Sequence, residues 1–463
     1  MHDTTILAHK PGNLQQSMKM LGTLLITLSA VTPASSVFII IPGIIATAGT
    51  GAFLSMVIAA FIGVCMALVY AELSSAYPLT GGEYAIVGRV VGPLAGFIVM
   101  GVNLVNLILI PAVMALGMST YLGVLFPNLP TIPTAIATVA LTTLIGILNI
   151  RSNALLTGIF LVIEILALVV LVWLGFAHAA RPISNLIASP VILSNGGLIH
   201  APIAAIGMAT SVAIFAYNGY GTAVYFGEET HDAHRHIARA ILWALVITVA
   251  AELIPLTALL IGAPDLKKFL VSSNMMGDFI GALGGSAVNT ALSLGIALAI
   301  FNSIIAMLLL AARMVYSTGR DMIWPTAVSK AFMQTHGKFN SPWVATVVSG
   351  VLAALACLVN ENVLFVITGS GLILIYGALC LAVIKGRLNG STAHGEYRMP
   401  LFPLAPIIAM VVMLYVIYAN WLDPVIGRPS LFTTLGICAV SIAYYAVMLR
   451  RRGAWVLRGP ENL

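Results

Sequence analysis

Residues 20–43 read MLGTLLITLSAVTPASSVFIIIPG, a stretch long and apolar enough to cross a lipid bilayer as a helix. Its middle, TPASS at residues 32–36, combines a helix-breaking proline with three hydroxyl side chains, and a second proline and a glycine follow at residues 42–43. A later apolar stretch, residues 202–226, carries a comparable interruption, AYNGYGT at residues 216–222. Unwound backbone inside a bilayer survives only where it lines a cavity or a binding site, so these two breaks indicate the fold most directly.

The composition is that of a polytopic membrane protein. Of the 463 residues, 60% are hydrophobic and 8% are charged, against about 25% charged residues in soluble domains. The apolar runs are continuous rather than alternating, which predicts an all-α protein with twelve spanning helices and no spanning strands. The expected spans are residues 21–47, 51–72, 92–124, 131–150, 154–177, 202–226, 237–262, 286–316, 341–360, 362–385, 403–422 and 429–449.

The basic residues predict the orientation of these spans. If both termini are cytoplasmic, 17 of the 21 Lys and Arg residues fall on the cytoplasmic side. The four on the outer side are Arg181, Lys267, Lys268 and Arg428. Because cytoplasmic loops are enriched in Lys and Arg, we expect an integral protein of the cytoplasmic (inner) membrane with both termini inside.

The two breaks lie five spans apart. Because five is an odd number of membrane crossings, a second five-helix unit that begins at the sixth span has the inverted orientation relative to the first. Interrupted helices at matching positions of two halves are typical of transporters with an inverted repeat and a site near the bilayer midplane. Proline and glycine also occur as packing kinks in membrane helices, and this alternative stays open. The predicted organisation is a cytoplasmic tail at 1–20, a first five-helix repeat at 21–177, a second, inverted repeat at 202–385, two peripheral helices at 403–449 and a cytoplasmic tail at 450–463.

A family resemblance supports this organisation. The segment AELSSAYPLTGGEY at residues 71–84 resembles the signature of the amino acid–polyamine–organocation superfamily of transporters. Three further segments also resemble that family: GP at 92–93, EET at 228–230 and ARMVYSTGRD at 312–321. The resemblance therefore covers essentially the whole chain. It implies the leucine-transporter-type fold, two inverted five-helix repeats plus two peripheral helices, and transport of amino acids or related amines by alternating access.

The substrate class has two candidates. Many relatives have a glycine-rich turn where this chain has TPASSVF at residues 32–38, and a threonine–proline there is more similar to branches that handle amines as well as amino acids. The main prediction is an amino acid permease, and the alternative is an importer of a polyamine such as putrescine or of another organic amine. A polyamine is cationic at both ends, so its site should display additional carboxylates near the bilayer midplane. Only Glu164 and Glu252 are candidates for such carboxylates, and this small number favours amino acids as substrates. A channel of short repeats does not fit twelve spans with two breaks.

The breaks also predict the substrate-binding residues. The half-helix after the first break offers free N–H groups and a positive dipole end to a substrate carboxylate. The resemblance places Ser35 and Ser36 in the carboxylate-binding turn, and it implies that carbonyl groups near Thr32, Phe215 and Asn218 accept hydrogen bonds from the substrate ammonium. The full predicted set is Thr32, Ser35, Ser36, Asn106, Phe215, Tyr217, Asn218 and Gly219.

Each of these assignments has a structural alternative. Ser35 and Ser36 could simply let helices pack closely. Phe215 aligns with an aromatic gate in relatives, and an ordinary packed aromatic is the alternative. Asn106 faces the region where relatives hold the substrate side chain, or it makes an interhelical hydrogen bond.

Coupling is expected at Glu164. Many relatives place a lysine at this point of the fifth span, so their lysine-based scheme does not carry over. Burial disfavours the charged form of a carboxyl group, so Glu164 can take up and release a proton. Coordination of sodium and a structural hydrogen bond are the alternatives, and sodium is disfavoured because the eighth span offers only Asn302 and Ser303. Glu252 lies in the seventh span near its outer end, where a water-facing structural role stays open.

Other chemistry is not indicated. The sequence has no Walker A loop, catalytic triad pattern or haem motif, and His231, His234 and His236 read as a solvated loop rather than a metal site. We therefore expect a secondary transporter without enzymatic activity, cofactor, metal or nucleic-acid partner. Its partners are the amino acid or amine substrate, a coupling proton or sodium ion, and the lipid bilayer.

Overall fold

The structure is a computed structural model that describes residues 14, 16–123, 126, 128–148, 150–194, 196–272, 274–452, 455, 457 and 458. The side chains at 120, 362, 365 and 449–452 are left out of this description. The predicted tails, 1–20 and 450–463, lie largely outside the described residues.

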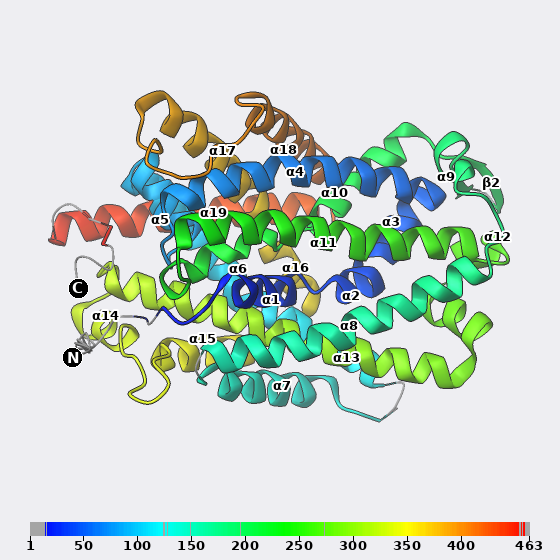
Figure 1. Cartoon of the computed structure of the whole chain (residues 1–463), viewed down its shortest axis with the longest axis horizontal. Coiled ribbons are helices and arrows are strands. Elements are labelled where there is room, and N and C mark those ends of the chain that lie inside the picture. The colour runs from blue at the N-terminus through cyan, green and yellow to red at the C-terminus, as the bar shows by residue number, and fades with distance from the viewer. Residues whose placement is uncertain are drawn as a thin grey trace, which may run out of the picture.

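The described chain is a bundle of helices that run along its long axis (Figure 1). The part before residue 178 consists of α1 (Met20–Val31), α2 (Pro33–Ser35), the π-helical η1 (Ser36–Ile40), α3 (Ile41–Ala48), the 3-10 turn η2 (Gly49–Gly51), α4 (Ala52–Ala76), α5 (Glu83–Val90), α6 (Pro93–Leu122), α7 (Thr131–Gly146) and α8 (Ile150–Ala177). The connection holds α9 (Ser184–Ala188), β1 (Val191–Ser194) and β2 (Gly197–His200).

The later part of the chain also consists mainly of helices. It consists of α10 (Ile203–Ala216), the 3-10 segment η3 (Tyr220–Glu229), α11 (Ala233–Gly262), α12 (Leu266–Val271), α13 (Met275–Arg320), α14 (Thr326–Phe332), α15 (Trp343–Ala356), α16 (Glu361–Thr368), α17 (Gly371–Asn389), α18 (Leu404–Leu422) and α19 (Gly427–Arg452). Helices α5 and α14 lie at one end of the molecule, and α9, β2 and α12 lie at the other (Figure 1). We call these the α14 end and the hairpin end.

The helices have the length and composition of membrane spans. Nine stretches of the described chain are long and apolar enough to cross a bilayer, and α7 and α15 are shorter apolar helices. One of the nine, Met20–Ala76, contains both the first and the second predicted span. The prediction of an all-helical polytopic membrane protein is therefore confirmed, apart from the short hairpin.

Close helix contacts are made by small residues, as expected where lipid removes the hydrophobic driving force. Helices α8 and α11 approach each other through Gly175 and Gly262, and a Cβ atom on Gly262 would lie 2.6 Å from the Gly175 Cα atom. This contact leaves no room for a side chain and fixes the separation of the two helices. The same pair of helices carries Glu164 and Glu252 further along.

The interruptions of the spans lie where the sequence places them. Helix α1 ends at Val31 and α10 ends at Ala216. The long helix α13 is kinked at Gly285, which has φ 77°, so the eighth predicted span begins directly after this kink. An additional break was not predicted: the tenth span is divided into α16 and α17 between Thr368 and Gly371.

The sequence reasoning did not predict the β1–β2 hairpin. Its strands are antiparallel, with Ser194 opposite Gly197 and Val191 opposite His200. The turn contains Gly196 with φ 75°, the positive φ that tight hairpin turns require. Thr50 Oγ1 accepts a hydrogen bond from the Val191 N–H at 2.8 Å, which ties the hairpin to η2.

Candidate functional site

The first break is a sharp turn at Thr32. This residue has φ 49° and ψ 70°, a left-handed conformation that is rare for a β-branched residue. Pro33 then begins α2, where its missing N–H is no loss. The π-helical turn η1 follows directly, and such turns are frequent at functional sites. The chain therefore begins a new, buried half-helix in the middle of the first span.

Glu164 of α8 occupies the start of this new half-helix. Its Oε1 atom accepts a hydrogen bond from the Ala34 N–H at 2.7 Å and one from the Thr32 hydroxyl at 3.3 Å. The Thr32 hydroxyl oxygen also lies 2.9 Å from Ser35 Oγ. A carboxylate is favoured here because the N-terminal end of a helix carries a partial positive charge. Of the N–H groups at the start of this half-helix, which were expected to be free, that of Ala34 is thus engaged by a side chain of the protein.

The second break lies against the first. Helix α10 ends at Ala216, and Gly219 has φ 122°, a conformation that favours glycine. A Cβ atom on Gly219 would lie 2.9 Å from Val31 Cγ2 and 3.0 Å from Val31 Cα, so the two backbones meet there. Ser36 Oγ donates a hydrogen bond to the Ala216 carbonyl at 3.1 Å and links the two interruptions directly.

The remaining predicted site residues are distributed around this contact. Asn218 Oδ1 accepts a hydrogen bond from the Tyr376 hydroxyl at 3.0 Å. Tyr217 is buried, and its hydroxyl has no hydrogen-bond partner among the described residues. Asn106 is buried and touches Gly371 of α17. Phe215 is 40% exposed and lies on the same face of α10 as the exposed Met208 and Val212. Its side chain is not enclosed at the contact between the breaks, and its role as a gate stays a prediction.

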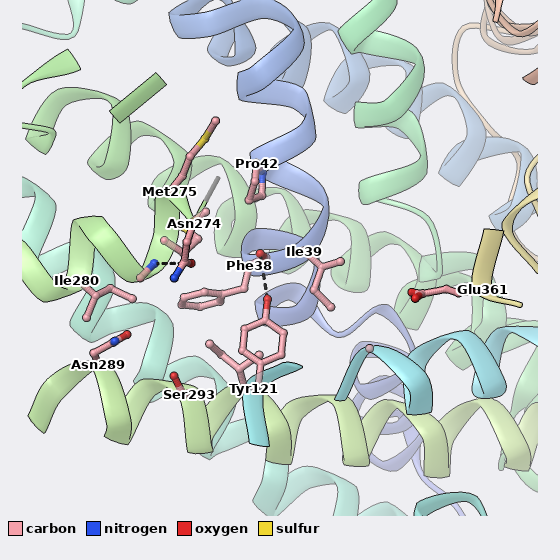
Figure 2. A pocket seen from close by; sticks show the side chains of 14 residues that line it. Phe38, Ile39, Pro42, Tyr121, Asn274, Met275, Ile280, Asn289, Ser293 and Glu361 are labelled. Atoms are coloured by element: carbon pink, nitrogen blue, oxygen red, sulfur yellow. Dashed lines mark hydrogen bonds between the residues drawn. The ribbon is translucent and has the colours of Figure 1, made fainter. Parts of the chain in front are cut away.

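A cavity of about 470 Å³ lies on the hairpin-end side of the first break. It is bounded by η1 and α3, by the later part of α6 and by the beginning of α13 (Figure 2). The Tyr121 hydroxyl donates a hydrogen bond to the Phe38 carbonyl at 3.1 Å, the contact drawn between these residues in Figure 2. Asn289 and Ser293 supply polar groups to the wall. The sequence reasoning missed these residues because nothing in their local sequence distinguishes them from other residues of apolar helices.

At the α14 end, buried ion pairs hold the bundle together. Arg313 binds Glu229 through two hydrogen bonds of 2.7 and 3.0 Å, and both side chains are buried. Arg320 binds Glu228 at 2.6 and 2.7 Å. The Thr80 N–H donates to Glu228 Oε1 at 3.0 Å, so this pair also reaches the loop after α4.

Two further contacts close the same end. Arg387 binds Glu72 through two hydrogen bonds of 2.7 Å, which joins α17 to α4. The Tyr84 hydroxyl lies 2.9 Å from Asp321 Oδ2, a carboxylate just beyond α13. Burial raises the pKa of Asp321 to about 6, while the neighbouring Arg320 acts in the opposite direction. Asp321 is therefore a group whose charge changes in mildly acidic solution.

The arrangement combines a polar break at mid-span, a cavity toward one end and buried ion pairs at the other. Comparison with known proteins decides the family. The family model described as amino acid permease matches residues 18–444. The chain belongs to this family. Its relatives are transporters of the amino acid–polyamine–organocation superfamily.

Three relatives of this permease are an uncharacterized transporter, an amine importer and an amino acid permease. An uncharacterized transporter of Mycobacterium tuberculosis is 26% identical over 385 residues, covering 81% of this chain and 83% of the relative. The low-affinity putrescine importer PlaP of Escherichia coli K12 is 23% identical and covers 63% of each chain. The branched-chain amino acid permease BcaP of Bacillus subtilis is 23% identical and covers 77% of this chain and 78% of the relative.

The buried ion pair Arg313–Glu229 gives the permease a testable element of stability. Replacing Arg313 with methionine leaves the Glu229 carboxylate buried without its cation, which costs about 3–5 kcal/mol. We expect a large fall in the Tm of the detergent-solubilised protein. The double variant Arg313→Met/Glu229→Gln removes both charges and should recover most of that loss. A Tm of Arg313→Met equal to that of the unmodified protein would contradict this account of the α14 end.

Proposed function

We propose that this permease is a secondary active transporter that moves amino acids across the cytoplasmic membrane by alternating access. The contact between the two broken helices carries the proposal: Ser36 is hydrogen-bonded to the Ala216 carbonyl, and Gly219 packs on Val31. Irregular backbone of this kind at membrane depth is found where transporters bind their substrates. A cavity on one side of it and buried ion pairs on the other fit a state that is closed toward the α14 end.

The proposed architecture has twelve spans arranged as two inverted five-helix repeats, at 21–177 and 202–385, plus two peripheral helices at 403–449. The nine apolar stretches support it, since Met20–Ala76 is long enough for two spans and α7 and α15 match the fourth and ninth expected spans. The α14 end would face the cytoplasm, with both termini on that side. The proposed outer side holds Arg181, one of the four basic residues expected there, and its guanidinium donates to the Leu260 and Ala263 carbonyl groups at the far end of α11.

An importer of amines is the second candidate, and one contact favours it. Glu164 occupies the Ala34 N–H group, one of the N–H groups at the start of the half-helix to which a substrate carboxylate was expected to bind. A second buried carboxylate, Glu252, lies within electrostatic range of Glu164. Two acidic groups beside the break attract an ammonium group and oppose a carboxylate. Among the relatives, PlaP is named a putrescine importer and BcaP a branched-chain amino acid permease, so both classes occur in this neighbourhood.

The proposed coupling ion is a proton, and its site includes Glu164. The Glu164 side chain is fully buried at the break, and its Oε2 atom has no hydrogen-bond partner among the described residues. A sodium site would need several oxygen ligands, and the Ser303 hydroxyl is instead directed at the sulfur of Met114, at 3.3 Å. Proton uptake needs no further ligand.

The proposal is tested by a ligand screen of the purified protein. Amino acids, diamines and monoamines are screened by thermal shift, and each compound that stabilises the protein is then measured in proteoliposome uptake. Stabilisation and uptake of amino acids support the first candidate. Uptake of amines alone supports the second. Uptake that requires ATP, or the absence of any transported compound in both classes, would contradict the proposal.

A further inference from the structure

Glu252 is a buried carboxyl group that has no part in the proton coupling proposed above. It lies on α11 and is fully buried. Neither of its carboxyl oxygens has a hydrogen-bond partner in the part of the chain that the structure describes. The sequence left open a water-facing position for this residue, and the structure places it in the interior. A buried carboxyl group without partners is costly and calls for a physical explanation.

The surroundings of Glu252 belong to the two breaks. Helix α11 packs against α2 and η1, the half-helix that begins after Thr32. Glu252 lies next to Ser36 and within electrostatic range of Glu164. It also lies within electrostatic range of Tyr217, whose buried hydroxyl has no hydrogen-bond partner among the described residues. Glu252 is therefore within electrostatic range of a carboxyl group that is hydrogen-bonded to the first break and of a hydroxyl group in the second break.

Among the described residues, Glu164 and Tyr217 are the titratable groups that interact electrostatically with Glu252. The elements packed against α11 include α1, α2, α4, α8, η1 and η3. Of the charged residues on them, Glu164 of α8 is the one that acts on Glu252. The protonation of Glu252 is thus linked to that of Glu164, and the pair responds as a unit.

The two carboxyl groups differ in what stabilises their charge. Glu164 accepts hydrogen bonds from the Ala34 N–H and the Thr32 hydroxyl and lies at the positive end of a half-helix. Glu252 has only the nearby Ser36 hydroxyl to stabilise its charge. Two neighbouring carboxylates in a buried site do not ionise together at low cost. A proton shared by such a pair is therefore held more firmly by Glu252, the group with fewer donors.

We propose that Glu252 binds the coupling proton and that Glu164, hydrogen-bonded to the first break, responds to its release. The inference rests on the proposed proton coupling and adds a second residue to that site. When Glu252 and Glu164 are both ionised, two negative charges repel each other in a buried site. Their repulsion weakens the hydrogen bond of Glu164 to the Ala34 N–H, the contact that holds the half-helix in place. Protonation would thereby favour one arrangement of the broken helix and deprotonation the other.

The test uses the full-length protein in proteoliposomes and the variant Glu252→Gln, which imitates the protonated state permanently. We expect loss of accumulation driven by an imposed pH gradient, down to the level of protein-free liposomes, with substrate exchange retained. Glu396→Gln, a substitution of an exposed loop carboxylate, is the matched control and should keep both activities. Glu252→Asp restores a titratable group, so it should recover pH-driven uptake with a shifted pH profile.

The outcomes separate this inference from the proposed function. If the unmodified protein accumulates substrate on a pH gradient and Glu252→Gln does so equally well, the role of Glu252 is wrong and proton coupling stands. If the unmodified protein shows no response to the pH gradient, both fail together. A loss of substrate affinity in exchange, with pH-driven uptake intact, would assign Glu252 to substrate binding and overturn the proposal. If Glu252→Gln does not fold, the pH profile of Glu252→Asp decides, and an unshifted profile contradicts the inference.

Discussion

Replacing Ser36 with leucine is expected to abolish uptake while the protein remains folded. Ser36 is buried at the start of the half-helix, and its hydroxyl bridges the two breaks through the Ala216 carbonyl. A leucine side chain would fill the space between the breaks and separate them. Overpacking of this kind costs about 1–3 kcal/mol, which is a local strain rather than unfolding. Uptake in proteoliposomes and the elution profile in size-exclusion chromatography measure the two effects.

Ser36→Ala is the matched control for this prediction. It removes the hydrogen bond to Ala216 but adds no volume, so the loss is about 1 kcal/mol and uptake should be reduced rather than abolished. Normal transport by Ser36→Leu would place the substrate site elsewhere in the molecule. Equal loss in both variants would assign the effect to the hydrogen bond instead of the space between the breaks.

The second large effect is expected for Glu164→Gln. A glutamine keeps an oxygen that accepts from the Ala34 N–H, so the half-helix should remain in place. The variant lacks a charge that responds to the protonation of its neighbours, so uptake driven by a pH gradient should be lost while exchange continues. Proteoliposomes with and without an imposed gradient measure the two activities separately. Full pH-driven uptake by Glu164→Gln would remove this residue from the coupling mechanism.

Glu164→Leu tests the structural part of the same contact. Leucine cannot accept a hydrogen bond, so the buried Ala34 N–H and Thr32 hydroxyl would both lose a partner. We expect this variant to lose exchange as well as pH-driven uptake, in contrast to Glu164→Gln. Identical behaviour of the two variants would show that the hydrogen bond to the break is dispensable.

The breaks of the first and sixth spans were predictable because their cause is local. Pro33 cannot continue the helix from α1, and Gly219 adopts a positive φ that other residues avoid. The kink at Gly285 has the same kind of local origin. The hairpin β1–β2 escaped prediction because its strands are four residues long, too short to show the alternation that marks a strand.

The site itself was only partly predictable. Glu164 could be placed near the first break from its position in the fifth span, but its hydrogen bond to Ala34 depends on how α8 packs against α2. The same holds for Glu252, whose proximity to Ser36 and Glu164 joins helices far apart in the sequence. Tyr121 donates a hydrogen bond to the Phe38 carbonyl in the π-helical segment η1, and no residue pattern predicts such a segment. Contacts of this type require the packed structure.

The most direct test of the account is transport of a screened substrate by the unmodified protein in sodium-free, ATP-free proteoliposomes with an imposed pH gradient. The account predicts accumulation of the substrate above its external concentration, and collapse of that accumulation when a protonophore dissipates the gradient. Accumulation that depends on a sodium gradient, or simple equilibration that ignores the pH gradient, would contradict it.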